Sequence, residues 1–321
     1  MYRTRVPDPV RSFRWRLALM ILAATAWAVP LWAAAEKQDD KLPPPDEATL
    51  KTADNITLAA TFYPSNLGKD LGKDLHKDAV PVVLLHAYKG SRGDFEELAL
   101  ELQRAGHAVM VPDLRGHGDS TQSRFADRAA ELRTVDYLAM VDEDMEAVKN
   151  YLMIRNNAGE LNIDKLCLVG VEMGAAVAVN WAARDWSWPM LTTGKQGQDV
   201  KALVLISPEW SFKGMRINEA MAHPNIRSDL SVMIIAGKAN GKAMQEAKRL
   251  HNALEKYHPM PPADLAAEKQ TLWFKTPQTS LQGMRLLNEK SMHLDHMIAK
   301  FIELRLVKKQ IPWSDRKHPL E

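Results

Sequence analysis

Cysteine is almost absent from this chain of 321 residues, and its scarcity excludes several kinds of chemistry. Cys167 is the only one, so no disulfide can form within the chain. It lies inside an apolar run, where a buried and unreactive thiol is expected. No cysteine stands behind the N-terminal apolar stretch in position for lipid attachment. Disulfide scaffolds and lipoproteins are therefore excluded.

The chain also lacks a strong charge of either sign. Its 42 basic and 40 acidic side chains leave a formal charge of +2. Residues 1–35 hold five arginines and one aspartate, so removing them leaves a net charge of −2. A chain so close to neutral offers no electrostatic case for binding nucleic acid. No repeat period is present, which excludes solenoid folds.

A basic cluster is present only at the N-terminus. Arginines up to Arg16 lead into the apolar stretch 17–35, which ends in three alanines. A basic start, an apolar centre and small final residues are typical of a secretory signal peptide. A retained membrane anchor is the alternative, because the stretch is nearly long enough to cross a bilayer, although Pro30 weakens it. Under either interpretation we expect an exported protein: periplasmic, secreted or membrane-anchored.

The rest of the sequence predicts one folded domain at residues 47–307. With 46% apolar residues, a chain of this length can bury a full core. Residues 36–46, which include three consecutive prolines, are typical of a linker. A doubled tetrapeptide at 68–75 indicates a solvated surface loop, and we expect a C-terminal tail at 308–321.

Apolar runs of strand length alternate with amphipathic stretches along this domain. The predicted strands are 80–85, 107–111, 165–169, 202–206 and 231–236. Helical spacing of apolar residues predicts helices at 94–105, 135–152 and 297–306. Such alternation predicts parallel βαβ units and a sheet with helices on both faces.

A turn with glycine at both ends, Gly170-Val171-Glu172-Met173-Gly174, joins one of these strands to a helix of small residues. The glycines allow a sharp turn and close helix packing, and the central residue is held on a strained bend. This pattern is typical of a nucleophile elbow, where a serine is expected at the centre. Here the central residue is Glu172.

These features resemble the α/β-hydrolase fold family, in the small uncapped branch of dienelactone hydrolases and serine-aminopeptidase-like esterases. Besides the elbow, the matching segments are 84–91, the turn Asp113-x-Arg115-Gly116-x-Gly118-x-Ser120, 205–208 and 234–237. The resemblance covers residues 47–307 and implies a three-layer α/β fold with a mostly parallel sheet. The interval 207–229 is too short for a large cap domain.

The resemblance also implies a catalytic serine, aspartate and histidine, in that chain order. The three positions here hold Glu172, Asn240 and Gln282. Glutamine has no useful proton affinity near neutral pH, so it cannot replace the histidine as general base. Nucleophile, base and orienting acid are therefore all replaced, and no catalytic residue is assigned with confidence.

The resemblance also assigns roles to residues around the implied catalytic site. The resemblance places the backbone of His86, Ala87, Tyr88 and Met173 around the oxyanion hole, and it makes His86 and His117 structural. Glu172 lies at a helix N-terminus, so it can fill its own oxyanion hole, held by the helix N–H groups and the Gln282 amide.

Two chemical alternatives remain open. His293 and His296 follow Gln282 closely, but they stand one turn before the last helix, where surface positions are the simpler interpretation. Their spacing can bind a metal ion, yet no third ligand is apparent. Glu172 itself could attack a substrate, as aspartate does in haloalkane dehalogenases and epoxide hydrolases. Those enzymes, however, also need a histidine and carry a cap domain.

The sequence thus favours an exported pseudo-hydrolase with a binding or structural role. A small-molecule or protein ligand in the former active-site pocket is the expected partner. The alternative is an esterase or related hydrolase that acts through the Glu172 carboxylate. We expect no cofactor, no metal ion and no nucleic acid, and membrane contact only through residues 1–35 if they are retained.

Overall fold

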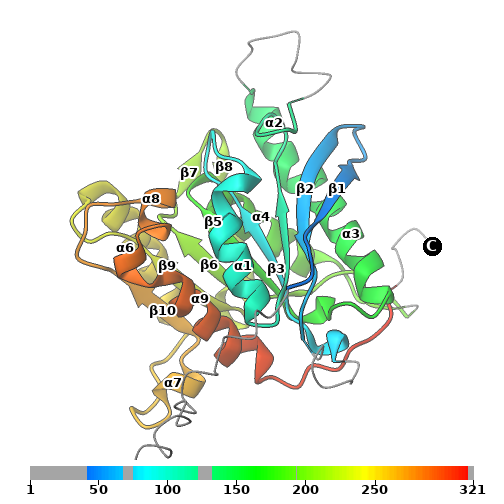
Figure 1. Cartoon of the computed structure of the whole chain (residues 1–321). Coiled ribbons are helices and arrows are strands. Elements are labelled where there is room, and N and C mark those ends of the chain that lie inside the picture. Colours follow the sequence, from blue (N-terminus) through cyan, green and yellow to red (C-terminus); the bar gives the residue numbers. More distant parts are fainter. Residues whose placement is uncertain (1–41, 68–74, 122–131, 193, 317–321) are drawn as a thin grey trace, which may run out of the picture. The chain divides into compact units, whose positions relative to one another are not determined.

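The fold is organised around an eight-stranded sheet (Figure 1). The computed structural model describes residues 42–67, 75–121, 132–192 and 194–316, so the expected signal or anchor at 1–35 lies outside it. The strands are β1 (Asp46–Lys51), β2 (Thr57–Tyr63), β3 (Pro81–Leu85), β4 (Ala108–Pro112), β5 (Leu166–Val171), β6 (Val200–Ile206), β9 (Ser231–Ile235) and β10 (Leu272–Lys275). All five predicted strands are confirmed, each within two residues at either end.

The order of the strands is β1-β2-β4-β3-β5-β6-β9-β10. β1, β2 and β4 pair antiparallel, and the pairs from β4 through β3, β5, β6 and β9 to β10 are parallel. The carboxyl ends of β5, β6, β9 and β10 consequently lie side by side at one edge of the sheet. In open α/β sheets, this is the edge where ligands bind.

Helices cover both faces of the sheet (Figure 1). They are α1 (Glu96–Arg104), α2 (Thr134–Ala139), α3 (Met145–Asn157), α4 (Met173–Ser187), α5 (Pro224–Ser228), α6 (Gly241–Glu255), α7 (Ala266–Lys269), α8 (Gly283–Leu287) and α9 (Leu294–Ile302). Short 3-10 turns lie at 76–78, 92–95, 163–165, 220–222 and 290–292. Single π-helical turns at 140–144 and 303–307 join α2 to α3 and extend α9, so both helices predicted there continue through a π-turn.

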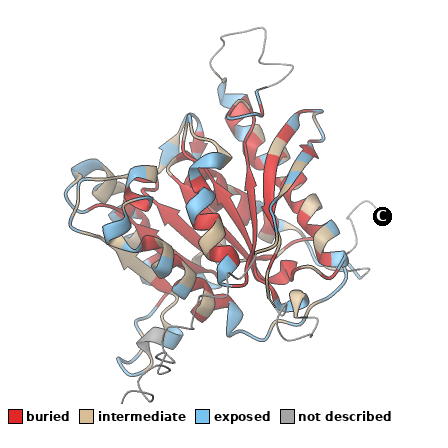
Figure 2. Cartoon of the chain, viewed as in Figure 1, coloured by how far each residue is buried: buried red, intermediate tan, exposed pale blue. Residues whose placement is uncertain are grey.

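Two hydrophobic cores lie on opposite faces of the sheet, whose central strands are almost entirely buried (Figure 2). Successive side chains of a strand point to opposite faces, so Val82 belongs to one core and Val83 to the other. One core includes α1 and α9, and the other includes α3, α4 and α6. This arrangement confirms the expected three-layer α/β fold.

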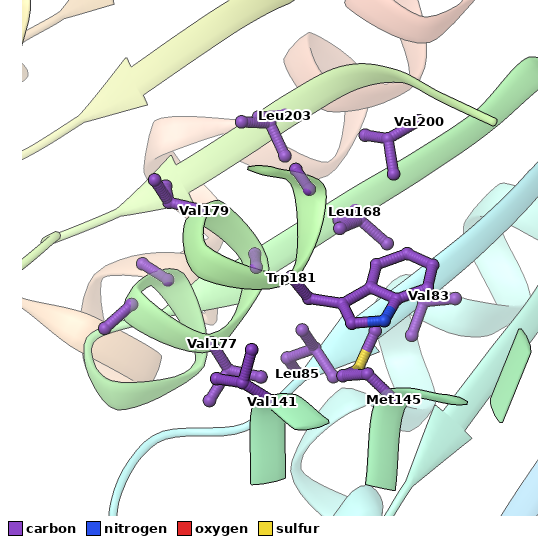
Figure 3. Close-up of a cluster of buried hydrophobic side chains, with 14 of the residues drawn as sticks. Val83, Leu85, Val141, Met145, Leu168, Val177, Val179, Trp181, Val200 and Leu203 are labelled. Carbon is purple, nitrogen blue, oxygen red and sulfur yellow. The ribbon is translucent and has the colours of Figure 1, made fainter. Parts of the chain in front are cut away.

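Trp181 of α4 is the largest fully buried side chain of the second core. Its ring lies beside Val83, Leu168 and Met145 (Figure 3). Its indole N–H donates to Glu146 Oε1 of α3 at 3.1 Å, which satisfies the one polar group of the ring. Truncating a tryptophan in such a place costs about 3–5 kcal/mol, so Trp181 fixes α4, and with it the elbow, on the sheet.

No large cap interrupts the fold. Between β6 and β9, the described chain forms only the hairpin of β7 (Ser211–Phe212) and β8 (Met215–Arg216), one 3-10 turn and α5. The uncapped architecture is therefore confirmed. Within the part of the chain that the structure describes, no helix combines the length and the apolar character needed to span a bilayer.

The turn after β4 is held by buried ion pairs, which explains its motif. Arg115 Nε donates to Asp144 Oδ1 at 2.8 Å and its Nη1 to Asp54 Oδ2 at 2.7 Å. A Cβ at Gly118, where φ is +49°, would lie 2.3 Å from the Asp113 carboxyl group. The motif residues thus serve structure, tying this turn to the β1–β2 hairpin and to the π-turn before α3.

The C-terminal segment packs on the domain over its described part, residues 308–316. Arg316 is buried, and its guanidinium pairs with Asp199 and with Asp164. Its backbone N–H donates to Asn157 Oδ1 at 2.9 Å, at the end of α3. Residues 308–316 therefore reach a buried charge cluster that includes Asp199, directly before β6.

Candidate functional site

The elbow has the expected geometry. Glu172 stands between β5 and α4 with φ +50° and ψ −108°, a combination that costs a non-glycine residue on the order of 1–3 kcal/mol. Its N–H donates to Ile206 O of β6 at 2.9 Å, which anchors the turn to the neighbouring strand. The prediction that Glu172 occupies a strand-to-helix turn is confirmed.

Both elbow glycines are required by close backbone contacts. A Cβ at Gly174 would lie 2.1 Å from Leu85 O, and one at Gly170 would lie 2.4 Å from Gly174 O. Real Cβ atoms do not approach a carbonyl oxygen so closely, so any side chain at either position would push α4 away from the sheet. The geometry of the elbow therefore requires both glycines, independently of the residue at its centre.

The structure brings the three triad-equivalent residues to one cavity of about 170 Å³. Glu172 follows β5, Asn240 follows β9 and Gln282 follows β10. The other lining residues are Ser207, Pro208, Glu209, Lys242, Ala243 and Glu246. We refer to this space as the elbow cavity. The three residues thus line one cavity at the carboxyl ends of the strands; that they stand at the positions of a catalytic triad stays a prediction.

Gln282 is fixed by hydrogen bonds to groups other than Glu172. Its Nε2 donates to Gly237 O at 3.0 Å, and its Oε1 accepts from Ser207 Oγ at 2.7 Å and from Gly237 N at 3.4 Å. Ser207 Oγ accepts in turn from Gly283 N at 2.9 Å. An amide fits this position because it offers a donor and an acceptor to the same backbone unit. Gln282 thus links β6, β9 and α8.

Asn240 acts as a helix cap. Its Oδ1 accepts from Ala243 N at 3.1 Å, at the start of α6. Asparagine is a favoured N-cap residue, and the bond satisfies one of the free N–H groups of the first turn. The side-chain oxygen of Asn240 is therefore occupied by the backbone of α6.

The Glu172 carboxylate packs against Gly283 and is not held by the helix. A Cβ at Gly283 would lie 2.2 Å from Glu172 Oε1. Glu172 makes no side-chain capping bond to α4, and the Gln282 amide bonds Gly237 instead. The expectation that these donors hold Glu172 in its own oxyanion hole is therefore wrong. Burial raises the pKa of Glu172, Glu209 raises it further, and Arg285 lowers it.

His86 is a structural histidine. It is fully buried, with Nδ1 2.8 Å from Ala87 O and with Nε2 accepting from Leu114 N at 3.1 Å. Since a carbonyl only accepts, Nδ1 carries the proton and Nε2 is the acceptor. Burial lowers the pKa of His86 to about 4, so the ring is neutral at physiological pH. His86 ties the end of β3 to the turn after β4.

The remaining oxyanion-equivalent residues do not line the elbow cavity. Ala87 and Met173 are buried, and Tyr88 lines a separate cavity of about 290 Å³ with His117 and Tyr137. His117 Nδ1 lies 3.1 Å from Arg115 O, and burial lowers its pKa. The assignment of this loop backbone and Met173 to an oxyanion hole stays a prediction.

His293 and His296 lie on the surface at the start of α9. His296 Nδ1 is 3.5 Å from Glu101 Oε1 of α1, and the two imidazole rings are 6.1 Å apart between their centroids. Neither residue lines the elbow cavity, whose lining contains no histidine. The described residues contain no group of three or more histidine, cysteine or acidic side chains placed to hold a metal ion.

Ser207 is the site residue that the sequence did not single out. The segment 205–208 matches the family pattern, but the role of Ser207 depends on its φ of +49° and on its contacts with Gln282 and Gly283. A local sequence signal for such contacts does not exist, because both partners lie more than 70 positions away.

Comparison with known proteins supports the fold assignment. The sequence model of the family described as alpha/beta hydrolase fold matches residues 80–247. The zebrafish (Danio rerio) sn-1-specific diacylglycerol lipase ABHD11 is 29% identical over 176 residues, which are 53% of this chain and 46% of that protein. This chain therefore matches less than half of that relative's length.

Solved structures give the same fold. Dienelactone hydrolase from Anabaena variabilis has a TM-score of 0.57 at 14% identity, over 83% of this chain and 99% of that one. A serine hydrolase without lid from Xanthomonas campestris has a TM-score of 0.52 at 17% identity, over 84% of this chain and 99% of the other. At these identities the likeness concerns the fold alone.

Proposed function

Since this chain belongs to the α/β-hydrolase fold family, we propose that it is an exported pseudo-hydrolase. It keeps the family's scaffold and elbow, it has lost the triad chemistry, and its former active-site cavity serves as a binding site. Residues 1–35, with a basic start and an apolar centre, support the export part of the proposal.

The observation that carries this proposal is that the side-chain amide of Gln282 is held by hydrogen bonds to Ser207 and Gly237. Hydrolysis by the family's mechanism needs a base that removes a proton from the nucleophile and then from water. Gln282 occupies the position of that base, and its amide is committed to Ser207 and to the backbone of Gly237. The lining of the elbow cavity contains no histidine, so the base that the family's mechanism uses is absent from it.

Glu172 alone cannot complete a catalytic cycle. A carboxylate that attacked an ester would form an acyl intermediate, which requires an activated water to be cleared. Asn240 offers no charge, and its oxygen caps α6. An acyl chain would also need an apolar surface, whereas Pro208 and Ala243 are the apolar members of the lining.

A hydrolase that works through Glu172 is the second candidate. Its support is the raised pKa of Glu172, because carboxyl groups with raised pKa values serve as general acids and bases in active sites. The lining of the elbow cavity contains no histidine that could activate water on an acyl intermediate, and this weighs against the second candidate.

Short acyl esters test the proposal. We expect no turnover above buffer by the wild-type protein, and none after Glu172→Ser, because a serine without a base stays unactivated. Turnover by the Glu172→Ser variant would reveal a base that the structure does not assign, and it would refute the proposal. Fractionation of cells that express the full chain tests export separately, and a cytosolic product would remove that part.

A further inference from the structure

Another cavity lies at the opposite edge of the sheet from the elbow cavity, where the parallel strands β3 and β5 begin. Its walls come from the turns before these two strands, from the segment after β2 and from the chain after the π-turn 303–307. Its volume is about 580 Å³, against about 170 Å³ for the elbow cavity. Small-molecule sites typically measure about 300–1,000 Å³. We refer to this space as the amino-edge cavity, and its lining includes Asp78, Lys165, Lys309 and four apolar side chains.

Lys165 brings a buried positive charge to this cavity. Its side chain is only 4% exposed, yet its ammonium group makes no hydrogen bond within the described part of the chain. Asp78 Oδ1 lies 3.6 Å from Lys165 Nζ, which is too far for a hydrogen bond, and the Asp78 side chain is 66% exposed. An ion pair with so well solvated a carboxylate contributes little. Because a buried ammonium with three donors is costly without acceptors, an acceptor that enters the cavity would be stabilised there.

The walls around Lys165 are tied to one another by hydrogen bonds. Asn162 Oδ1 accepts from Asp164 N at 3.1 Å and so caps the 3-10 turn 163–165 that carries the lysine. The amide of the same Asn162 donates to Ile311 O at 3.0 Å, in the C-terminal segment that forms another wall. The amino-edge cavity is therefore built by connected elements and not by one exposed loop.

The charges of the lining favour an anion. Lys309 provides a second ammonium group, and desolvation together with the charge of Arg305 lowers the pKa of Lys309. A negative charge beside Lys309 would offset this effect. Since Asp78 is the acidic residue of the lining, two cations and one anion leave a net charge of +1. A ligand with one negative charge neutralises the cavity, whereas a doubly charged phosphate would also meet the repulsion of Asp78.

The apolar part of the lining favours a ligand with a hydrocarbon chain. Val307 is 46% exposed, although large apolar side chains are mostly buried in this protein. A chain packed on it would remove apolar surface from water, which is favourable by about 25 cal/mol per Å². An inorganic anion would leave this surface uncovered. The apolar lining side chains are Leu67, Val307, Ile311 and Pro312.

We infer that the amino-edge cavity binds an alkyl carboxylate. Its carboxylate accepts hydrogen bonds from Lys165 Nζ, Lys309 adds a second positive charge, and the hydrocarbon chain covers Val307 and its apolar neighbours. This ligand class matches the cavity in charge, in polarity and in size. The inference is independent of the proposed function, because it concerns the opposite edge of the sheet from Glu172.

The test is a titration of the full chain with sodium hexanoate, followed by ligand-observed NMR. Parallel titrations use 1-hexanol, which keeps the chain without the charge, and inorganic phosphate, which keeps a negative charge without the chain. We expect saturable binding of hexanoate, and binding of the other two probes at least about tenfold more weakly.

Three variants with a matched control locate the binding. Lys165→Met keeps an unbranched apolar side chain without the charge and should weaken hexanoate binding about tenfold or more, and Lys309→Met should weaken it less. Asp78→Asn removes the competing negative charge and should strengthen binding about threefold. Lys308→Met removes a neighbouring lysine whose ammonium pairs with Glu303, and it should leave binding unchanged.

The inference is overturned if hexanoate shows no saturable binding up to about 10 mM, or if 1-hexanol binds as well as hexanoate. Phosphate that binds as tightly as hexanoate would show a simple anion site and would equally overturn it. Hexanoate binding that is the same in the cavity variants as in the Lys308→Met control would place the ligand elsewhere on the chain. If Lys165→Met does not fold, Lys309→Met and Asp78→Asn decide, because they must shift the affinity in opposite directions.

Discussion

Replacing Gly283 by alanine tests the contact that positions Glu172. The new Cβ would lie 2.2 Å from Glu172 Oε1 and 2.7 Å from its Cδ, so the carboxylate must move. Leaving its rotamer costs about 0.5–1.5 kcal/mol. Alanine at φ +57° adds about 1–2 kcal/mol of backbone strain. We therefore expect Gly283→Ala to lower the free energy of unfolding by about 1.5–3.5 kcal/mol.

A double-mutant cycle with Glu172→Ala separates the two terms. Without the glutamate side chain, Gly283→Ala should cost only the backbone strain, about 1–2 kcal/mol. Urea denaturation of the wild type, both single variants and the double variant gives the coupling energy, which should be about 0.5–1.5 kcal/mol. Equal costs of Gly283→Ala in the two backgrounds would show that the carboxylate does not rest on Gly283, and the geometry of the cavity would be refuted.

Three further predictions concern other parts of the molecule. Gln282→Ala should lower the free energy of unfolding by about 1–3 kcal/mol, because it leaves Ser207 Oγ and the Gly237 backbone without their hydrogen-bond partner. The control Gln245→Ala, at an exposed position of α6, should cost less than about 0.5 kcal/mol. Equal effects of the two substitutions in urea denaturation would contradict the assigned role of Gln282. Arg316→Ala should cost up to about 3 kcal/mol, because it removes one of the cations that pair with the buried Asp199 and Asp164, although Lys195 still pairs with both. Lys308→Ala should cost less than about 0.5 kcal/mol, because its pair with Glu303 is exposed. Equal effects of the two substitutions would show that the Arg316 ion pairs do not stabilise the domain. Burial lowers the pKa of His107 to about 4, so the folded protein disfavours the protonated ring. The contribution of neutral His107 to the free energy of unfolding is therefore complete above pH 6.5 and decreases as the pH falls toward 4. Between pH 7 and pH 5 this loss is about 2 kcal/mol. The free energy of unfolding of His107→Gln should therefore change less over that interval than that of the wild type. Asp144, whose pKa burial raises to about 6, has the opposite pH dependence, but it is present in both proteins and cancels in the comparison.

The parallel strands of the fold were predictable because their side chains are buried on both faces. β3 and β5 are apolar along their whole length, which distinguishes them from amphipathic segments. β10 was not predicted, since its four residues at the sheet edge are only half-buried beyond Leu272 and include Lys275. The elbow was predictable because close backbone contacts allow only glycine at positions 170 and 174. This requirement appears in the sequence as two glycines at a fixed spacing.

The contacts within the elbow cavity were not predictable from the sequence. The position of Gln282 followed from the pattern Gln-Gly-x-x-Leu-Leu, but its bonds to Ser207 and Gly237 depend on how the ends of β6 and β9 meet. Likewise, the helix dipole suggested donors for Glu172 that the strained backbone of the elbow does not provide. Long-range hydrogen bonds of this kind have no signature in local composition.

The central claim is that the elbow glutamate carries no hydrolytic chemistry. The most direct test compares the rates at which the purified wild-type protein and the Glu172→Ala variant hydrolyse p-nitrophenyl acetate near neutral pH. Because the cavity lining has no histidine to act as the family's general base, the two rates should be equal and should match the rate in buffer with an unrelated protein. A wild-type rate clearly above this background, and abolished by Glu172→Ala, would contradict the account.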